Sequence, residues 1–223
     1  MRHSLERLRP AITRAVVLGL LLAAMIALAS SDAIHGAVIG LLEATRGVID
    51  AHPIAGPVLF AVAAAVSALA AFVSSAVLIP AAVYAWGPEV TILLLYVGWL
   101  LGGVLGYLAA AYLGRPFLRW LISPATLARY ERFVSRPLSF TAVLLLQLTI
   151  PSELLAYALG LMRYPLSRYL GALAIAQVPY AIGTVLLGVG FVERDTSTLV
   201  GVGLAGLAGF LAVAWLAARH AHR

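Results

Sequence analysis

Residues 147–188 constrain the fold more than any other part of the chain, because they place polar and helix-breaking side chains in a largely apolar sequence. An ionisable side chain at the centre of a bilayer costs at least about 2.5 kcal/mol, and proline removes backbone hydrogen bonds that lipid cannot replace. Interrupted backbone is tolerated at membrane depth only where protein or a water-filled cavity covers it. We therefore predict that residues 147–160 form a re-entrant, interrupted helix that lines a polar cavity. The side chains behind this argument are Pro151, Glu153, Arg163, Pro165, Arg168, Gln177 and Pro179.

The composition is that of an integral membrane protein. Of the 223 residues, 63% are hydrophobic and 11% are charged, and several apolar runs reach the length of about 18 residues that a spanning helix needs. The lack of cysteine excludes disulfides, thiolate metal sites and thiol catalysis. The histidines are terminal or isolated, so we expect no metal site and no cofactor. A single polytopic domain is predicted.

The interrupted segment has a counterpart upstream. Ile79-Pro80 recurs as Ile150-Pro151, and Gly87 recurs as Gly160. Each of these glycines is followed after 11 residues by another glycine and after 20 residues by a tyrosine, Tyr107 or Tyr180. Paired, interrupted hydrophobic segments in two halves of a chain are typical of transporter folds with inverted repeats. We predict an all-α polytopic membrane protein built as an inverted repeat of a re-entrant hairpin plus a transmembrane helix.

The chain divides into five predicted segments. The apolar run 15–29 is either a first transmembrane helix or a cleaved signal peptide, and residues 34–49 form an amphipathic helix that lies in the membrane interface or packs on the bundle. In the first repeat, the hairpin tip is predicted near residues 67–75, with Pro80 in its second limb and a turn at Gly87. The segments are 1–53 (N-terminal and interfacial helices), 54–114 (repeat 1), 115–137 (arginine-rich loop), 138–190 (repeat 2) and 191–223 (last transmembrane helix and tail).

The arginines predict the orientation. All fifteen basic residues are arginine. With the N-terminus inside and both hairpins re-entrant from opposite faces, thirteen of them face the cytoplasm, and only Arg46 and Arg194 face outward. This is the positive-inside asymmetry, and it would be lost if one hairpin crossed the membrane. We expect a multi-pass protein of the plasma membrane with both termini cytoplasmic.

Three stretches carry a resemblance to a known family. They are GxxxGYLAAAYLGR at residues 102–115, IPSELLAYALGL at 150–161 and YLGALAIAQVPYAIGTVLLG at 169–188. Over residues 57–188 the chain resembles the DedA/VTT-domain superfamily (SNARE-associated Golgi protein-like). The resemblance implies two inverted re-entrant hairpins and movement of lipids or lipid-linked phosphates between leaflets. Some bacterial members are associated with recycling of undecaprenyl phosphate, and eukaryotic members with phospholipid scrambling.

The candidate site residues follow from the polar residues in the apolar segments and from the family resemblance. Many relatives carry an arginine near the position of Gln147, and Arg163 or Arg168 could supply that charge here. Glu153 is expected either to bind a proton or to cap the half-helix that follows Pro151. Gln147, Tyr157, Tyr107 and Tyr180 are substrate or proton-site candidates, with backbone tethering or packing as the alternative. Four residues are expected to shape the hairpins: Pro80, Gly87, Pro151 and Gly160. Gly102 and Gly106 form a GxxxG motif that lets another helix approach closely.

Lipid transport or scrambling, with proton coupling as one variant, is the predicted function. The first alternative is a membrane assembly or scaffold factor without transport activity. A lipid-modifying enzyme is disfavoured, because the sequence has no HExxH, GxSxG or multi-aspartate pattern, and we expect no enzymatic activity. The expected partners are membrane lipids, either a polyprenyl phosphate or a phospholipid. Nucleic acid is not expected, and self-association into a homo-oligomer is left open.

Overall fold

The computed structural model describes residues 31, 32, 36, 40, 43, 53–69, 75–121 and 138–220. The predictions for the apolar run 15–29, most of the interfacial helix and most of the arginine-rich loop lie outside these residues. The described part is all-helical, with six α-helices, one 3-10 helix and no strand. In chain order these are α3 (Ala55–Leu69), η1 (Ser75–Leu78), α4 (Ile79–Leu121), α6 (Phe140–Gln147), α7 (Ser152–Leu161), α8 (Leu166–Val192) and α9 (Thr196–His220).

Three helical segments are long and apolar enough to cross a membrane: Ile79–Gly114, Leu166–Val192 and Thr196–Val213. Two further apolar helices, Ala55–Leu69 and Ser152–Leu161, are too short to cross it. Because an α-helix rises 1.5 Å per residue, the ten residues of α7 extend only about 15 Å. The prediction of an all-helical membrane protein with several spans is confirmed.

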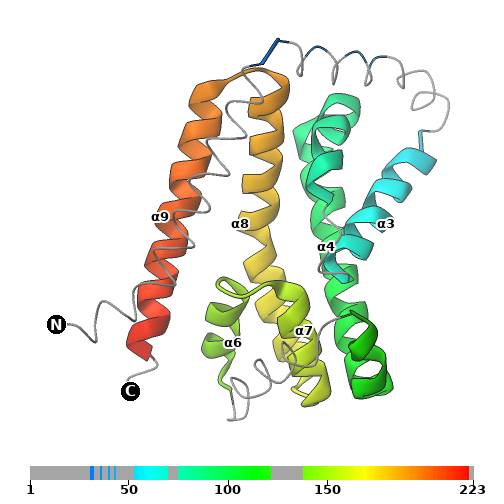
Figure 1. The fold of residues 1–223 in the computed structure, drawn as a ribbon, viewed down its shortest axis with the longest axis vertical. Coiled ribbons are helices and arrows are strands. Elements are labelled where there is room, and N and C mark those ends of the chain that lie inside the picture. Colours follow the sequence, from blue (N-terminus) through cyan, green and yellow to red (C-terminus); the bar gives the residue numbers. More distant parts are fainter. Residues whose placement is uncertain are drawn as a thin grey trace.

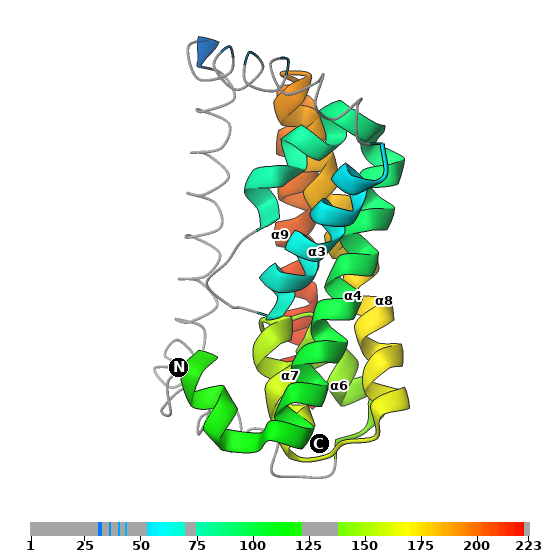
Figure 2. The ribbon, with the colours of Figure 1, turned by 90° about the vertical axis from the view of Figure 1, so that its right-hand side faces the viewer.

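The long and the short helices have different places in the molecule. α4, α8 and α9 run along its length, whereas α3, α6 and α7 each cover only a part (Figure 1). α3 starts at the end of the molecule where α8 passes into α9 and stops near the middle, while α6 and α7 occupy the opposite end. η1 and the residues up to Gly87 lie in the same half as α3 (Figure 2). The short helices therefore approach the middle from opposite ends.

Two glycines divide α4 into three pieces. Gly87 has φ 78° and ψ 168°, and Gly114 has φ 66° and ψ −159°, conformations that residues with a Cβ rarely adopt. Thr91 Oγ1 donates to the Gly87 carbonyl oxygen at 2.7 Å and satisfies one group freed by the break. The predicted turn at Gly87 is confirmed. Pro80 is the second residue of α4 and follows η1, so the second limb changes from 3-10 to α-helix there.

The glycines of α4 receive two different helices. A Cβ at Gly98 would lie 2.6 Å from the backbone oxygen of Ala61, and one at Gly102 would collide with the backbone of α3 at Ala65. Gly106 instead faces the ring of Tyr157 on α7. The motif Gly102-x3-Gly106 does bring helices close, as predicted, but its two glycines contact α3 and α7 respectively.

The buried side chains form two main clusters along α4 and α8. One lies where α6 and α7 pack between these helices, with Tyr107, Val143, Leu155, Leu159, Tyr169 and Leu173. The other lies near α3 and the start of α4, with Phe60, Ile79, Leu95, Ala181 and Val185. α9 lies along α8, and most of its residues are exposed. The interior is thus organised around the short helices.

Candidate functional site

The helix interruption lies between α6 and α7, at residues 148–151. α6 ends at Gln147, and Pro151 is the N-cap of α7 without a side-chain cap bond. Side chains satisfy two of the freed backbone oxygens, because Thr149 Oγ1 donates to Leu145 O at 2.9 Å and Tyr180 Oη donates to Leu148 O at 2.7 Å. The predicted interruption of the second segment at Pro151 is confirmed.

Gln147 ends α6 with its amide in the interior. The side chain is 3% exposed, and neither Oε1 nor Nε2 has a hydrogen-bond partner. The buried Tyr169 hydroxyl donates to the Gly103 backbone oxygen at 3.1 Å and makes no hydrogen bond with this amide. Leaving a buried polar group unpaired costs about 1–3 kcal/mol. Gln147 is therefore a polar group that the surrounding packing does not satisfy.

Glu153 lies in the first turn of α7, as the sequence predicts, and is half-buried. Ser152 Oγ donates to its Oε2 at 3.4 Å, a long hydrogen bond. Glu153 lies four residues before Tyr157, and therefore on the same face of α7 as this buried tyrosine. Among the described residues no basic group lies within ion-pair distance of it. A carboxylate at this position also interacts favourably with the positive end of the α7 dipole.

The three predicted tyrosines each donate a hydrogen bond to the backbone. Tyr157 donates to Leu69 at the end of α3, Tyr107 donates to Tyr164 after α7, and Tyr180 donates to Leu148. These contacts match the packing alternative for all three. The sequence analysis missed Tyr169, which is fully buried and stacks on Tyr107 with ring centroids 5.1 Å apart. The helical spacing of the buried residues Tyr169, Leu173 and Ala176 on α8 is the signal that could have identified it.

The two candidate arginines lie apart from Gln147 and Glu153. Arg163 follows the end of α7 and Arg168 lies in the first turn of α8, and both are exposed. The turn between α7 and α8, which contains Arg163, lies at the end of the molecule, whereas α6 ends near the middle (Figure 1). The length of α7 separates the turn of Glu153 from Arg163. In this conformation the arginines do not supply a charge beside Gln147.

Gly87 and Gly160 match in sequence but differ in structure. Gly160 is inside α7, and a Cβ there would collide with the backbone oxygen of Tyr107 on α4. The positive φ that Gly87 adopts before the first long helix is adopted in the second half by Arg163, with φ 51°. Gly160 therefore permits close packing of α7 on α4, whereas Gly87 forms a break in α4, so the two glycines affect their hairpins in different ways.

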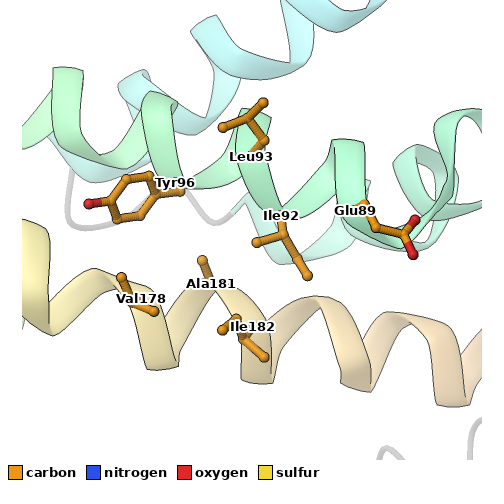
Figure 3. A pocket seen from close by; sticks show the side chains of 7 residues that line it. All are labelled: Glu89, Ile92, Leu93, Tyr96, Val178, Ala181 and Ile182. Carbon is orange, nitrogen blue, oxygen red and sulfur yellow. The ribbon is translucent and has the colours of Figure 1, made fainter.

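A cavity of about 210 Å³ lies between α4 and α8, lined by Glu89, Ile92, Leu93, Tyr96, Val178, Ala181 and Ile182. Figure 3 shows the first four side chains on α4 and the last three on α8. None of the predicted site residues lines it. At the polar cavity predicted around residues 147–160, Gln147, Tyr157 and Tyr169 are buried by the packing of α4, α7 and α8, whereas Pro151 is exposed and Glu153 is half-buried. Among the described residues, no group of three histidine, aspartate or glutamate side chains could hold a metal ion.

A comparison with models of protein families identifies the family of this chain. The family model described as the VTT domain matches residues 72–190, which is 119 of 223 residues. The chain belongs to the VTT domain family. This confirms the resemblance found in the sequence. No curated protein and no solved structure matches the chain.

The matched VTT domain contains every residue assigned to the candidate site. It includes η1, α4, α6 and α7, and it ends two residues before the end of α8. α3 and α9 lie outside it, although α3 packs on Gly98 and Gly102 of the VTT domain. The site therefore belongs to the VTT domain, while the backbone oxygen that Tyr157 contacts comes from a helix outside the matched residues.

Proposed function

We propose that this VTT-domain protein moves lipids or lipid-linked phosphates between the leaflets of a membrane, through a polar passage between two re-entrant hairpins. The observation that carries the proposal is the buried, unpartnered amide of Gln147 at the interruption between α6 and α7. A group of this kind favours a conformation in which water or a polar headgroup reaches it, because hydration removes the cost of burial.

The two hairpins of this proposal are α3 with η1 and the first piece of α4, and α6 with α7. Equivalent contacts in the two halves support an inverted repeat. Gly98 packs on α3, the first limb of the first hairpin, and Gly171 faces Phe140 of α6, the first limb of the second. The two hairpins enter from opposite ends of the molecule, so the inversion that relates these two contacts would also relate one hairpin to the other.

The contacts that join one half to the other are also equivalent. The second limb of the first hairpin packs on α8, where Ile79 faces Gly188. The second limb of the second hairpin packs on α4, where Gly160 faces Tyr107 and Ala110. Each hairpin is thus held by the long helix of the other half, and opposite movements of the two hairpins would open a passage on one side or the other.

Glu153 is the proposed proton-binding group. It lies beside the interruption and on the same face of α7 as Tyr157, and no described basic group pairs with it. In the neutral form it would allow the tips of the hairpins to stay dry, and in the charged form it would favour water between them. Transport coupled to a proton gradient is therefore the form of the function that we propose, without a covalent step on the lipid.

An anionic headgroup is the proposed substrate chemistry. α7 begins near the middle of the molecule, and the positive end of its dipole favours a phosphate. Arg163 and Arg168 are exposed at the end of the second hairpin, where they can attract the headgroup before it enters. We propose the plasma membrane as the location, with both termini cytoplasmic, from the arginine asymmetry.

A scaffold role is the second candidate. The observations that favour it are the closed packing of Gln147 and Tyr157 and the exposed surface of α9, which leaves a long apolar helix free for another membrane protein. In this role the protein would bind membrane partners without moving lipid.

Leaflet exchange in proteoliposomes tests the proposal. Purified protein is reconstituted with fluorescent anionic or zwitterionic lipids, and dithionite quenches the label in the outer leaflet. We expect quenching beyond the outer-leaflet fraction, faster for anionic lipids and dependent on a proton gradient. Arg163→Ala with Arg168→Ala should slow anionic lipids more than zwitterionic ones. Exchange no faster than in protein-free vesicles, with and without the gradient, would favour the scaffold.

A further inference from the structure

Tyr157 is the residue through which α7 reaches α3. Its side chain is fully buried, and its hydroxyl donates to the backbone oxygen of Leu69, the last residue of α3. Carbonyls in the last turn of a helix have no partner inside the helix, so this oxygen is available to accept. The two residues are 88 positions apart, and no other hydrogen bond joins α3 to α7 in the described part of the chain.

The ring and the hydroxyl of Tyr157 are held by different helices. The ring packs on α4, where a Cβ at Gly106 would lie 3.2 Å from its Cε1, and Ala110 is buried with it in one cluster. The hydroxyl makes the hydrogen bond to α3, while Leu69 also packs against the side chain. Phenylalanine at this position would keep the packing on α4 and on Leu69 and remove only the hydrogen bond to α3.

This contact lies between the two hairpins of the proposed passage. α3 and α7 approach the middle of the molecule from opposite ends (Figure 1), and Leu69 packs against Tyr157 together with Leu154. A headgroup that passes between the hairpins needs these elements to separate. We propose that the Tyr157 hydroxyl is a latch that joins α3 to α7 and holds the polar residues around Gln147 in the closed state. This inference rests on the proposed function.

The latch can be tested by the reactivity of a buried cysteine, because the chain has none of its own. Ser67 lies in the last turn of α3, is 6% exposed, donates to the Ala64 backbone oxygen at 2.8 Å and is hydrogen-bonded to the Ser75 hydroxyl at 3.0 Å. In a Ser67→Cys chain, reconstituted in vesicles, a water-soluble maleimide should react only when the hairpins separate. Adding Tyr157→Phe should raise the rate about fivefold, the factor that corresponds to a hydrogen bond of about 1 kcal/mol.

Two controls separate release of the latch from general loosening. Tyr180→Phe removes a comparable hydrogen bond, from Tyr180 Oη to Leu148, that does not join the two hairpins, so it should leave the rate at Ser67→Cys unchanged. A second reporter, Ala172→Cys, is fully buried between α7 and α8 and should stay unreactive in the Tyr157→Phe chain. No change at Ser67→Cys, or an equal rise at both reporters, would overturn the latch.

The reactivity assay does not depend on lipid movement. If Tyr157→Phe opens Ser67→Cys but the protein exchanges no lipid, the latch stands and the proposed transport fails. If the protein exchanges lipid and Tyr157→Phe changes neither exchange nor reactivity, transport stands and the latch fails.

Discussion

Replacing Gln147 by methionine should stabilise the protein and slow lipid exchange. Methionine has nearly the length of glutamine and no hydrogen-bonding amide, so it fills the same space at the end of α6. The wild-type amide is 97% buried with both polar atoms unpartnered, which costs about 1–3 kcal/mol in the closed state. If the amide is hydrated in the open state, removing it lowers the energy of the closed state alone. Exchange that is limited by opening should slow about 5- to 150-fold.

Two measurements check this prediction together. Thermal unfolding in detergent should show a higher midpoint for Gln147→Met than for wild type, and the dithionite assay should show slower exchange. Gln147→Glu is the opposite control, because a buried carboxylate costs more than an amide and should lower the midpoint. A lower midpoint for Gln147→Met, or unchanged exchange despite a higher midpoint, would refute the reasoning that the unpaired amide drives opening.

Three further predictions follow from individual residues. Gly160→Ala should lower the free energy of unfolding by about 1–3 kcal/mol, because the added Cβ would collide with Tyr107. The control Gly201→Ala adds a Cβ with nothing within 4 Å and should be neutral or stabilising. Denaturant unfolding of both variants tests the packing of α7. Hydrogen bonds from Ser197 and Thr198 lower the pKa of Asp195, which precedes α9, to about 2. The carboxylate therefore stabilises the folded state above its ordinary pKa of 3.8, and this stabilisation is lost as the pH falls through about 2. The difference in thermal midpoint between wild type and Asp195→Asn should therefore disappear between pH 4 and 2, and a constant difference would contradict a stabilising role of these hydrogen bonds. Glu153→Gln should remove the pH dependence of exchange without loss of folding, and equal pH profiles for variant and wild type would leave Glu153 a structural residue.

The interruptions could be predicted from the sequence because they depend on local chemistry. Pro151 cannot continue a helix that precedes it, and Gly87 has the conformational freedom that a break with positive φ requires. The lengths of the apolar runs likewise predict the spans, since the thickness of a bilayer sets the number of helical residues needed to cross it. These features are confirmed in α4, α7 and α8 without knowledge of any partner helix.

The partners of these elements were decided only by the tertiary structure. Gly102 and Gly106 are four residues apart in one motif, yet they receive α3 and α7 respectively. Gly160 matches Gly87 in the repeat, yet it serves close packing and the turn falls at Arg163. Helical spacing shows which residues share a face of a helix, but it does not identify the helix that packs there.

The closed state of the candidate site also required the structure. Tyr157 was predicted as a substrate or proton-site residue, and its contact with Leu69 links positions 88 residues apart. The polar residues of this apolar segment predict that protein or water covers them, and in this conformation protein covers Gln147. The sequence predicts that residues 147–153 avoid lipid, and only the packing of α4, α7 and α8 determines what Gln147 faces, because burial follows from shape complementarity between segments that are distant in the chain.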